Sequence, residues 1–534
     1  MNYLASLLKS QRGIVWSVAA LSFLLFASYS IYSGVNLEDA FITYRYARNL
    51  AVGNGFTFNP GEHVLGTTAP LHALILAAGA KIFGVSAIPD ISVCLMLLCG
   101  VAAAVVLCNI LYRVTESSIV SFLGPLVFVT NRTVLLTTCG GMETPLVILL
   151  MLSSMLSTLK KQWILAGILS VLLVLTRIDG IIWAALLLLY SFRVSWRGAM
   201  IQVAVLVGCL LPAAAMAGWY FGSPIPHTVI AKRIVGPTAW LSDSLLSIER
   251  VQMWSQWLTT QCNCAPTMLI GFATLFGVVG ILRRKSAAAL LFVVFPACYI
   301  VALYIGRASL DFDWYLTPVI LCTSSLIGIG IGELSDCFRW YNLALHRRHM
   351  FLIAMAILLL PMSTIIMMDI RWEFFRSRMF QSTLETGLRR PVGEWLRDHT
   401  PAGATVAMEA VGYQAYFSER RVIDIAGLVS PEVVRIRRRS GTNAEAFARI
   451  LKELRPDYLV LRTFEMEQNQ HLHGGPLFEN EKERLFFLTH YKEVKRFVAP
   501  RNYGPLSRIT VYGPAAQETV SDAIQNKPSG CYVQ

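Results

Sequence analysis

Charged residues are scarce in this sequence. Only 15% of its 534 residues are Asp, Glu, Lys or Arg, whereas 55% are hydrophobic and the mean hydropathy is +0.54. Soluble domains average about 25% charged residues, so this composition excludes an ordinary soluble protein and indicates a polytopic membrane protein. Acidic residues are fewer than basic ones, which leaves a formal net charge of +13.

The basic excess is not gathered on one soluble face. Lysines and arginines fall largely in short clusters between apolar runs. Such clusters are typical of the cytoplasmic loops of a membrane protein, whereas a nucleic-acid-binding domain carries a basic patch. We therefore attribute the excess of basic residues to the membrane topology of the chain, and we expect no nucleic-acid partner.

Cysteine patterns that would indicate disulfides or zinc are also missing. Most of the 11 cysteines lie inside apolar runs, where cysteine behaves as a small hydrophobe. Cys262 and Cys264 form a single C-x-C without the second pair of a zinc site. No small-x-small cleavage site follows the first apolar run, residues 13–33, so an uncleaved first span is expected.

Long apolar runs are plentiful and predict about eleven membrane-spanning helices. Basic residues recur in alternate connections, which the positive-inside rule assigns to the cytoplasm. Residues 37–70 and everything after about 370 are then expected on the opposite side of the membrane. The spans are predicted near residues 13–33, 87–112, 118–136, 143–159, 163–176, 180–192, 199–221, 266–282, 286–305, 315–334 and 350–368.

The first outer loop, residues 35–86, is predicted to hold two helices lying along the membrane. Residues 70–84 are apolar but too short for a span and contain a His and a Lys. Residues 37–50 have Ile42, Tyr46 and Leu50 at a spacing of four, with Arg45, Arg48 and Asn49 expected elsewhere on the helix.

The composition changes near residue 390 to that of a soluble α/β unit. Helical patterns at 391–403 and 444–455 alternate with strand patterns at 404–408, 420–427, 456–462, 492–498 and 507–513. We expect two domains, a transmembrane catalytic domain over 1–370 and a periplasmic α/β domain over 371–534.

Polar motifs embedded among apolar residues all fall on the same predicted side. Ionisable residues at membrane depth are costly and tend to be functional, so convergence from five loops predicts one extracytoplasmic cavity. The motifs are Glu38-Asp39, Gly140-Gly141-Met142-Glu143, Thr176-Arg177-x-Asp179, PIPHTVIAKR at 224–233, which carries His227 and Lys232, and the segment from Arg307 to Asp313.

Each motif also has a structural interpretation. Asp39 could cap the helix that follows it, and Glu143 could suit the positive end of a helix that starts with Thr-Pro. Arg177 and Asp179 could pair to close a tight turn. The segment with His227 and Lys232 could be a solvated loop, and the carboxylates at 311 and 313 are too few for a metal site.

In combination the motifs resemble a known family. LEDAFITYRYARNLAVGNGFTFNPGEHVLGTTAPLHALIL, GGMETPL, LTRIDG and SPIPHTVIAKR, in that order, resemble the polytopic GT-C glycosyltransferases, in particular bacterial arabinofuranosyltransferases related to the mycobacterial terminal β-arabinofuranosyltransferase. The stretch from VGEWLRDHTPAG to LVSPE resembles the C-terminal module of that family. The chain departs from the family in having Glu-Asp where two Asp are commoner, and His227 where Asn is expected.

The resemblance implies transfer of a sugar, arabinofuranose as the first choice, from a polyprenyl-phosphate donor to a periplasmic glycan, lipopolysaccharide or protein. Asp39 matches the acidic position of the family and would be the general base, with Glu38 in reserve. Arg177, His227, Lys232 and Arg307 would stabilise the leaving phosphate, while Glu143 and Asp179 hold sugar hydroxyls or orient the cations. No obligatory metal or other cofactor is expected.

Two alternatives stay open at this point. One is a GT-C transferase that uses polyprenyl-phosphate mannose or another hexose. The other is a transporter or flippase for lipid-linked sugars, although transporters often show inverted repeats and broken helices at the bilayer midplane. No repeat is visible in this sequence and the charges fall at one end of the predicted spans, which favours the enzyme.

Overall fold

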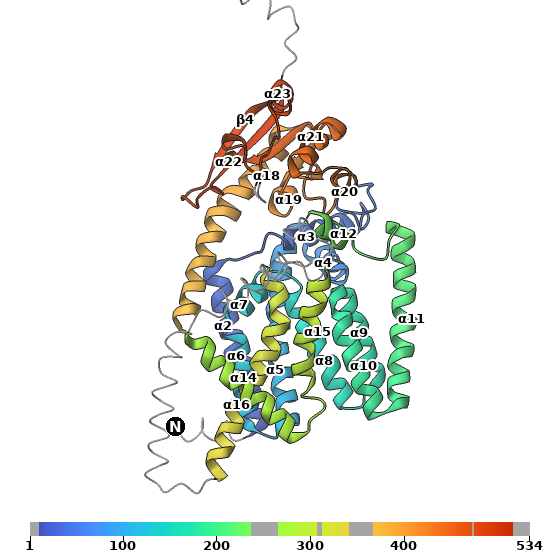
Figure 1. The fold of residues 1–534 in the computed structure, drawn as a ribbon, viewed down its shortest axis with the longest axis vertical. Coiled ribbons are helices and arrows are strands. Elements are labelled where there is room, and N and C mark those ends of the chain that lie inside the picture. The colour runs from blue at the N-terminus through green and yellow to red at the C-terminus, as the bar shows by residue number, and fades with distance from the viewer. Residues whose placement is uncertain (1–9, 236–264, 307–311, 341–366, 472–474, 516–534) are drawn as a thin grey trace, which may run out of the picture.

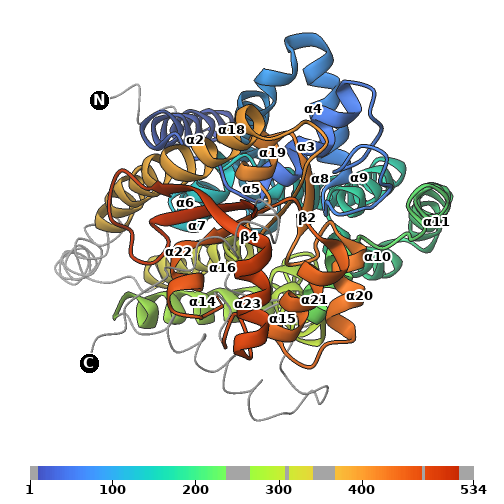
Figure 2. The ribbon, with the colours of Figure 1, turned by 90° about the horizontal axis from the view of Figure 1, so that it is seen from above.

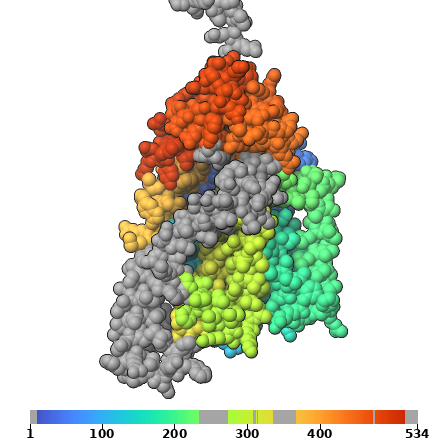
Figure 3. Space-filling view, viewed as in Figure 1, coloured from blue at the N-terminus to red at the C-terminus, as the bar shows by residue number. Residues whose placement is uncertain are grey.

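The computed structural model describes residues 10–235, 265–306, 312–340, 367–471 and 475–515. A bundle of apolar helices carries an α/β domain at one end, as Figure 1 shows from the side. The space-filling view in Figure 3 shows the outer domain covering that end of the bundle. The first outer loop lies between the two parts, so residues from three regions of the sequence can meet there.

Apolar helices build the bundle, and their buried side chains form its largest core, with Trp183, Phe292, Phe295 and Tyr299 among the bulkiest members. The expected span at 350–368 falls almost entirely outside the described residues. The helices are α2 (Gln11–Ser33), α5 (Ile88–Thr115), α6 (Ser118–Val129), α7 (Arg132–Cys139), α8 (Thr144–Leu159), α9 (Trp163–Thr176), α10 (Ile181–Val194), α11 (Trp196–Phe221), α14 (Ala265–Arg284), α15 (Leu291–Gly306) and α16 (Asp313–Trp340).

Within the described residues, four helices are long and apolar enough to cross a membrane. They are Gln11–Ser33, Val85–Thr115, Trp196–Phe221 and Trp314–Leu334, and the bent pair of α6 and α7 makes a fifth if it counts as one span. The helices α4, α8, α9 and α15 are apolar but shorter. The total of eleven spans stays a prediction.

One expected helix is broken. Residues 118–136 were expected to form a single span, but α6 ends at Val129 and α7 starts at Arg132 after a bend of 67°. Asn131 takes an extended backbone conformation between them, and its side chain accepts a hydrogen bond from the Thr133 N–H at 2.9 Å. An Asn that caps a new helix is a stop signal inside an apolar run, and hydrophobicity alone does not reveal it.

The first outer loop forms the two predicted short helices, α3 (Ala40–Ala51) and α4 (Pro70–Phe83), followed by the turn η1 (Val85–Ala87). Pro70 occupies the first helical position of α4, where its missing N–H costs nothing. Figure 1 places both helices between the bundle and the outer domain. Two of the polar residues of α3, Arg45 and Asn49, are buried at 2% and 4% exposure.

Arg45 is buried because its guanidinium satisfies carbonyl groups of two regions. It donates to the carbonyl oxygens of Phe58 in the first loop at 2.8 Å and of Arg420 in the outer domain at 2.6 Å, and also to that of Ala415. The guanidinium carbon lies 4.4 Å from the centre of the Phe58 ring. Arg45 therefore fastens the first loop to the outer domain.

The outer domain is built on a five-stranded sheet of order β2-β1-β3-β5-β4. The first three strands are parallel and β5 runs antiparallel to both of its neighbours. Every strand and helix expected here is present. The strands are β1 (Thr405–Met408), β2 (Arg421–Asp424), β3 (Tyr458–Arg462), β4 (Tyr491–Val498) and β5 (Arg508–Pro514), and the helices are α18 (Arg390–His399), α19 (Tyr413–Ser418), α20 (Pro431–Arg438), α21 (Asn443–Leu454), α22 (Thr463–Glu467) and α23 (Glu481–His490).

One face of this sheet completes its core with side chains of the first outer loop. Ile42, Tyr46 and Phe58 share a buried cluster with Val406 and Val460 of the sheet. The other face packs against α20 and α21. Burial of apolar surface stabilises such contacts by about 25 cal/mol per Å², so the loop and the outer domain hold each other in place.

A continuous helical stretch joins the bundle to the outer domain (Figure 1). It is α-helical over 367–380, becomes the π-helix η3 (Gln381–Arg389), and continues as α18. Helix α19 packs beside α3 of the first loop, and α18 packs against α19, as the view from above in Figure 2 shows. The predicted domain boundary at residue 370 lies near the start of this stretch.

Candidate active site

The acidic pair Glu38-Asp39 stands at the junction of all three regions. It follows the short extended segment after α2, where the Leu37 N–H donates to the Gly140 carbonyl at 2.8 Å. Both acidic residues are partly exposed. Asp39 occupies the N-cap position of α3, but its side chain makes no capping hydrogen bond. The capping interpretation of Asp39 is therefore not supported, and within the described residues no hydrogen bond or ion pair holds its carboxylate.

Glu38, by contrast, is bound by the outer domain. Its Oε1 accepts a hydrogen bond from the Gly412 N–H, from a residue 374 positions later in the chain. A Cβ atom added at Gly412 would overlap the Glu38 backbone carbonyl. Only glycine leaves room for this approach, so the contact depends on the residue type at 412.

The π-helix η3 places further polar groups beside the pair. Gln381 accepts from the Asn36 N–H at 3.2 Å and donates to the Tyr413 hydroxyl at 2.8 Å, and that hydroxyl donates to the Asn36 carbonyl at 3.2 Å. One helical turn further on, Arg389 forms an ion pair with the buried Glu385.

Electrostatics favour a proton on this group of acids. Burial raises the pKa of Glu38 to about 8, the charge of Asp39 raises it further, and Arg389 opposes the shift. Burial likewise raises the pKa of Glu385 to about 7, again against the effect of Arg389. At neutral pH the uncharged forms of both glutamates are therefore substantially populated.

The glycine motif at 140–141 supports the same junction from the bundle side. The Tyr44 hydroxyl donates to Asn36 Oδ1 at 2.9 Å and contacts the Gly141 carbonyl at 3.2 Å. Gly141 has φ +75°, and a Cβ there would overlap the Tyr44 hydroxyl. The motif thus positions the backbone just before the acidic pair, which is a role that the sequence did not indicate.

Arg177 and Asp179 form the expected pair, and the buried Glu143 joins them in one ionic cluster. Arg177 contacts Glu143 at 3.2 Å and Asp179 at 2.8 Å, and the Tyr299 hydroxyl donates to Asp179 Oδ2 at 2.8 Å. The guanidinium carbon of Arg177 lies 5.0 Å from the centre of the Tyr315 ring. Arg177 is thus oriented by two carboxylates and an aromatic face.

Lys232 lies close to the same aromatic ring. Its Nζ is 5.6 Å from the centre of Tyr315 and 5.3 Å from that of Phe312, distances that suit a cation–π contact. Lys232 belongs to α12 (His227–Val235), and within the described residues it has no ion-pair partner. The structure therefore brings two of the predicted cations, Arg177 and Lys232, to one aromatic surface.

His227 faces a different neighbourhood. Its backbone N–H donates to the Leu65 carbonyl at 2.7 Å, and burial lowers the pKa of its imidazole, opposed by a hydrogen bond with the Gly427 backbone. Residues five apart on a helix point about 140° from each other, so His227 and Lys232 lie on different sides of α12. The backbone of His227 thus holds α12 to the first loop, while its imidazole contacts the outer domain, and a cationic His227 at the phosphate stays a prediction. Arg307 lies outside the described residues.

Sequence reasoning missed the outer-domain members of the site, Gln381, Glu385, Arg389, Gly412 and Tyr413. The spacing of Glu385 and Arg389 at i, i+4 is a signal of an ion pair. It does not say which tertiary partner the pair meets.

A separate set of possible metal ligands lies in the outer domain. Single ligand atoms of Glu409, Glu465 and His471 lie within 4.8 Å of one another. Arg462 supplies positive charge there already, at 3.5 Å from Glu409 and 3.4 Å from Glu465. The cluster is therefore explained as ion pairing.

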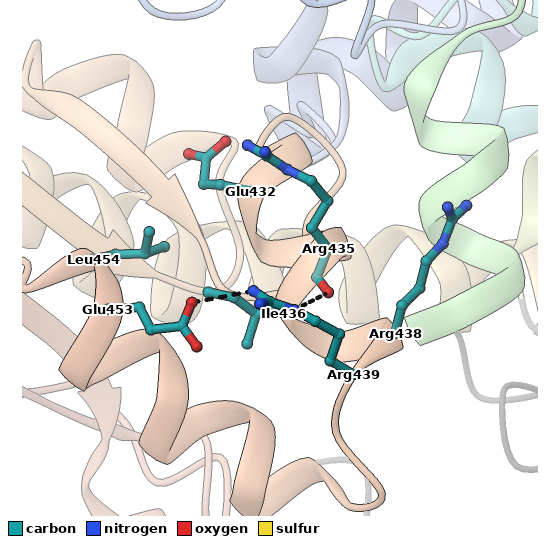
Figure 4. Close-up of a pocket in the computed structure, with 7 residues that line it drawn as sticks. All are labelled: Glu432, Arg435, Ile436, Arg438, Arg439, Glu453 and Leu454. Carbon is teal, nitrogen blue, oxygen red and sulfur yellow. Dashed lines mark hydrogen bonds and ion pairs between the residues drawn. The ribbon is translucent and has the colours of Figure 1, made fainter.

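The outer domain also has a surface hollow of about 510 Å³ beside α20 and α21. Figure 4 shows Arg439 paired with Glu453 there, at 3.1 Å, while Arg438 points toward α12. The residues around it, Glu432, Arg435, Ile436, Arg438, Arg439, Glu453 and Leu454, include none of the acidic junction.

Comparisons with known proteins agree with this architecture. A family model described as a domain of unknown function, DUF8728, matches residues 378–520. No curated protein matches the chain. The crystal structure of ArnT from Cupriavidus metallidurans bound to undecaprenyl phosphate is 14% identical, with a TM-score of 0.53 over 95% of this chain and 99% of that chain. The apo structure of the same protein is 11% identical, with a TM-score of 0.52 over 94% and 98%. At these identities the likeness establishes a shared fold, and it supports the predicted GT-C fold.

Proposed function

We propose that the protein is a membrane glycosyltransferase that moves a sugar from a polyprenyl-phosphate donor to an acceptor in the cell envelope. The observation that carries this proposal is the junction at Asp39. A carboxylate held by no hydrogen bond or ion pair among the described residues stands where bundle, first loop and outer domain meet. The fold shared with ArnT, whose structure holds undecaprenyl phosphate, supports a lipid-linked donor.

The reaction assigned to this site is a displacement at the anomeric carbon. Asp39 takes the proton of the acceptor hydroxyl as that oxygen bonds to the sugar. The bond from the anomeric carbon to the phosphate oxygen breaks, and its electron pair leaves with the polyprenyl phosphate. The products are the glycosylated acceptor, a protonated Asp39 and a phosphate that carries one more negative charge than in the donor.

That extra charge calls for a cation at the phosphate, and Lys232 suits this role best. Its ammonium lies against Phe312 and Tyr315 and has no carboxylate partner in the described part of the chain. Arg177 is partly neutralised by Glu143 and Asp179, so it contributes orientation and less free charge. Charged hydrogen bonds that strengthen as the leaving group forms lower the barrier in a dry site.

We propose arabinofuranose as the sugar and the periplasmic face of a bacterial inner membrane as the location. A glycan, lipopolysaccharide or protein could be the acceptor, and a mannose or hexose donor is the alternative. A transporter is disfavoured, because the charged groups of the bundle cluster lie at helix ends, with Arg177 directly after α9 and Glu143 directly before α8, whereas transporter sites lie near the bilayer midplane.

Incubation of the purified protein with synthetic polyprenyl-phosphate arabinofuranose, and separately with the mannose donor, tests the function. Mass spectrometry should detect release of polyprenyl phosphate with the arabinose donor in the presence of cell-envelope fractions, and none with Asp39→Asn. Release from the mannose donor alone would correct the sugar. No release from either donor would contradict the transferase proposal.

The orientation is tested with reporter fusions. A reporter fused after residue 375 should be active only in the periplasm, and one fused after Lys285 only in the cytoplasm. The reverse pattern would place the acidic junction in the wrong compartment for this reaction.

A further inference from the structure

We propose that the outer domain is part of the catalytic centre, with Arg389 and Glu385 acting as positioning residues that set the charge on the acidic pair Glu38-Asp39. This inference rests on the proposed function. It assigns a role to the domain of unknown function matched at 378–520, which sequence similarity alone leaves without one.

The contacts between the two parts are specific and lie directly at the acids. Glu38 accepts from the Gly412 N–H, and Asn36, two residues earlier, is held by Gln381 and Tyr413. A domain that only covered the bundle would need apolar contacts alone. This one adds hydrogen bonds to the backbone and side chains of residues next to the proposed base.

The helical geometry explains why these outer-domain residues act together. Gln381, Glu385 and Arg389 follow one another at a spacing of four within η3, and the side chains of Gln381 and Glu385 are 6% and 1% exposed. π-Helical segments are rare and occur frequently at functional sites. Here the segment lies in the only described helical connection from residue 367 into the outer domain, so a shift of the domain would move these groups relative to Asp39.

The charges of the cluster do not balance. Three carboxyl groups, on Glu38, Asp39 and Glu385, face one guanidinium, on Arg389, and the neighbouring Tyr413 hydroxyl is neutral. Burial makes a net negative charge costly, and it is relieved when a carboxyl group keeps a proton. Glu385 Oε2 is buried and has no hydrogen-bond partner in the described residues, which fits an uncharged carboxyl group.

The consequence is a division of roles within the cluster. A proton held by Glu38 or Glu385 removes a repelling charge beside Asp39, the proposed base. Arg389 supplies the positive charge of the cluster. Removing Arg389 should make a negative charge in the cluster more costly, whereas Glu385→Gln replaces a carboxyl group that already holds its proton at acid pH and should change little.

These two different effects define the experiment. In the full-length enzyme, Arg389→Gln should lower kcat about ten- to a hundredfold, leave the donor KM within about twofold, and move the acid limb of the pH–rate profile to higher pH. Arg389→Lys should recover part of the loss. Glu385→Gln, which keeps the neutral charge that Glu385 has at acid pH, should leave the acid limb in place. Arg397→Gln, which removes an exposed arginine paired with Asp398, is the matched control and should change neither kcat nor the profile.

A purely structural role would lower yield or kcat in Arg389→Gln without moving the acid limb, and that result would overturn the proposal. Infrared titration gives a second measurement that does not need activity. A protonated carboxyl band should persist at neutral pH in the wild type and lose intensity in Glu38→Gln and Glu385→Gln. Absence of this band would also overturn the proposal. A band without transfer activity would leave the cluster intact while refuting the transferase function.

Discussion

The two ionic clusters of this molecule both centre on one arginine, but they differ in how their charges are satisfied. In the bundle cluster, Arg177 contacts both of its carboxylates, Glu143 and Asp179, directly. In the junction cluster, Arg389 pairs with Glu385, while Asp39 is left without a direct partner among the described residues. In the bundle cluster, each charged group has a direct partner and a fixed geometry. The junction cluster contains one carboxylate, that of Asp39, without a direct partner among the described residues.

This difference indicates which of the two clusters is suited to proton transfer. A buried charge whose partners are all in place is expensive to disturb, so the bundle cluster is suited to orient a surface for the donor. Carboxyl groups with raised pKa values beside a free carboxylate are typical of sites that exchange protons. Substitutions in the two clusters should therefore fail in different ways, the junction in rate and the bundle in stability.

The largest effect on turnover is expected at Asp39. Asp39→Asn keeps the size of the side chain but cannot accept a proton, so turnover should fall by about two to four orders of magnitude. Thermal stability in detergent should hardly change, because the carboxylate makes no capping bond. Measurement of the transfer rate at saturating donor, together with melting curves in detergent, tests this prediction.

Glu38→Gln is the internal control, since the amide oxygen can still accept from the Gly412 N–H. It should be milder than Asp39→Asn. A silent Asp39→Asn beside an inactive Glu38→Gln would move the base one residue back.

Substitutions in the bundle cluster should lower the stability of the folded protein. Arg177→Ala leaves Glu143 and Asp179 without their cation, and removing one partner of a buried pair typically costs about 3 to 5 kcal/mol. We expect a large drop in melting temperature and yield. Arg193→Ala, at an exposed arginine of α10, should be near neutral. A stable Arg177→Ala with weakened donor binding would instead make Arg177 a direct phosphate ligand.

Substitution of Lys232 should have an intermediate effect, with weaker binding of the donor phosphate in a protein that remains stable. Lys232→Ala removes a charged hydrogen bond worth about 1.5 to 3 kcal/mol, or about ten- to a hundredfold in affinity. Binding of undecaprenyl phosphate to the detergent-solubilised protein measures it. Lys81→Ala, at an exposed lysine of α4, is the matched control, and equal affinities for the two variants would exclude Lys232 from the phosphate site.

Much of this arrangement follows from the sequence, because local patterns determine it. Apolar runs, the short helices of the first loop and the alternating units after residue 390 each carry their own signal. The pairing of Arg177 with Asp179 was also readable, since the two residues are adjacent in a turn. The GT-C resemblance supplied Asp39 as a candidate.

The rest depends on contacts between distant segments. Burial of Arg45 requires the carbonyl groups of residues 415 and 420, which no pattern in α3 reveals. The meeting of Glu38 with Gly412 joins positions 374 residues apart. The same limit explains why the polar residues of η3 carried no signal that they would lie beside the acidic pair.

The smallest expected effect is on the pH dependence of the protein's stability, and it arises from Glu385. Its pKa is raised from an ordinary value of 4.5 to about 7, chiefly by burial. A raised pKa means that the folded state holds the proton more tightly, so the stabilisation is complete below about pH 4.5 and is lost as the pH rises to about 7. Glu385→Gln removes this dependence, and its melting temperature should therefore gain on that of the wild type between pH 5 and 7. Melting temperatures measured by tryptophan fluorescence at several pH values test this prediction. If the melting temperatures of the two proteins depend on pH in parallel, Glu385 is ionised throughout this range and Arg389 fully compensates its charge.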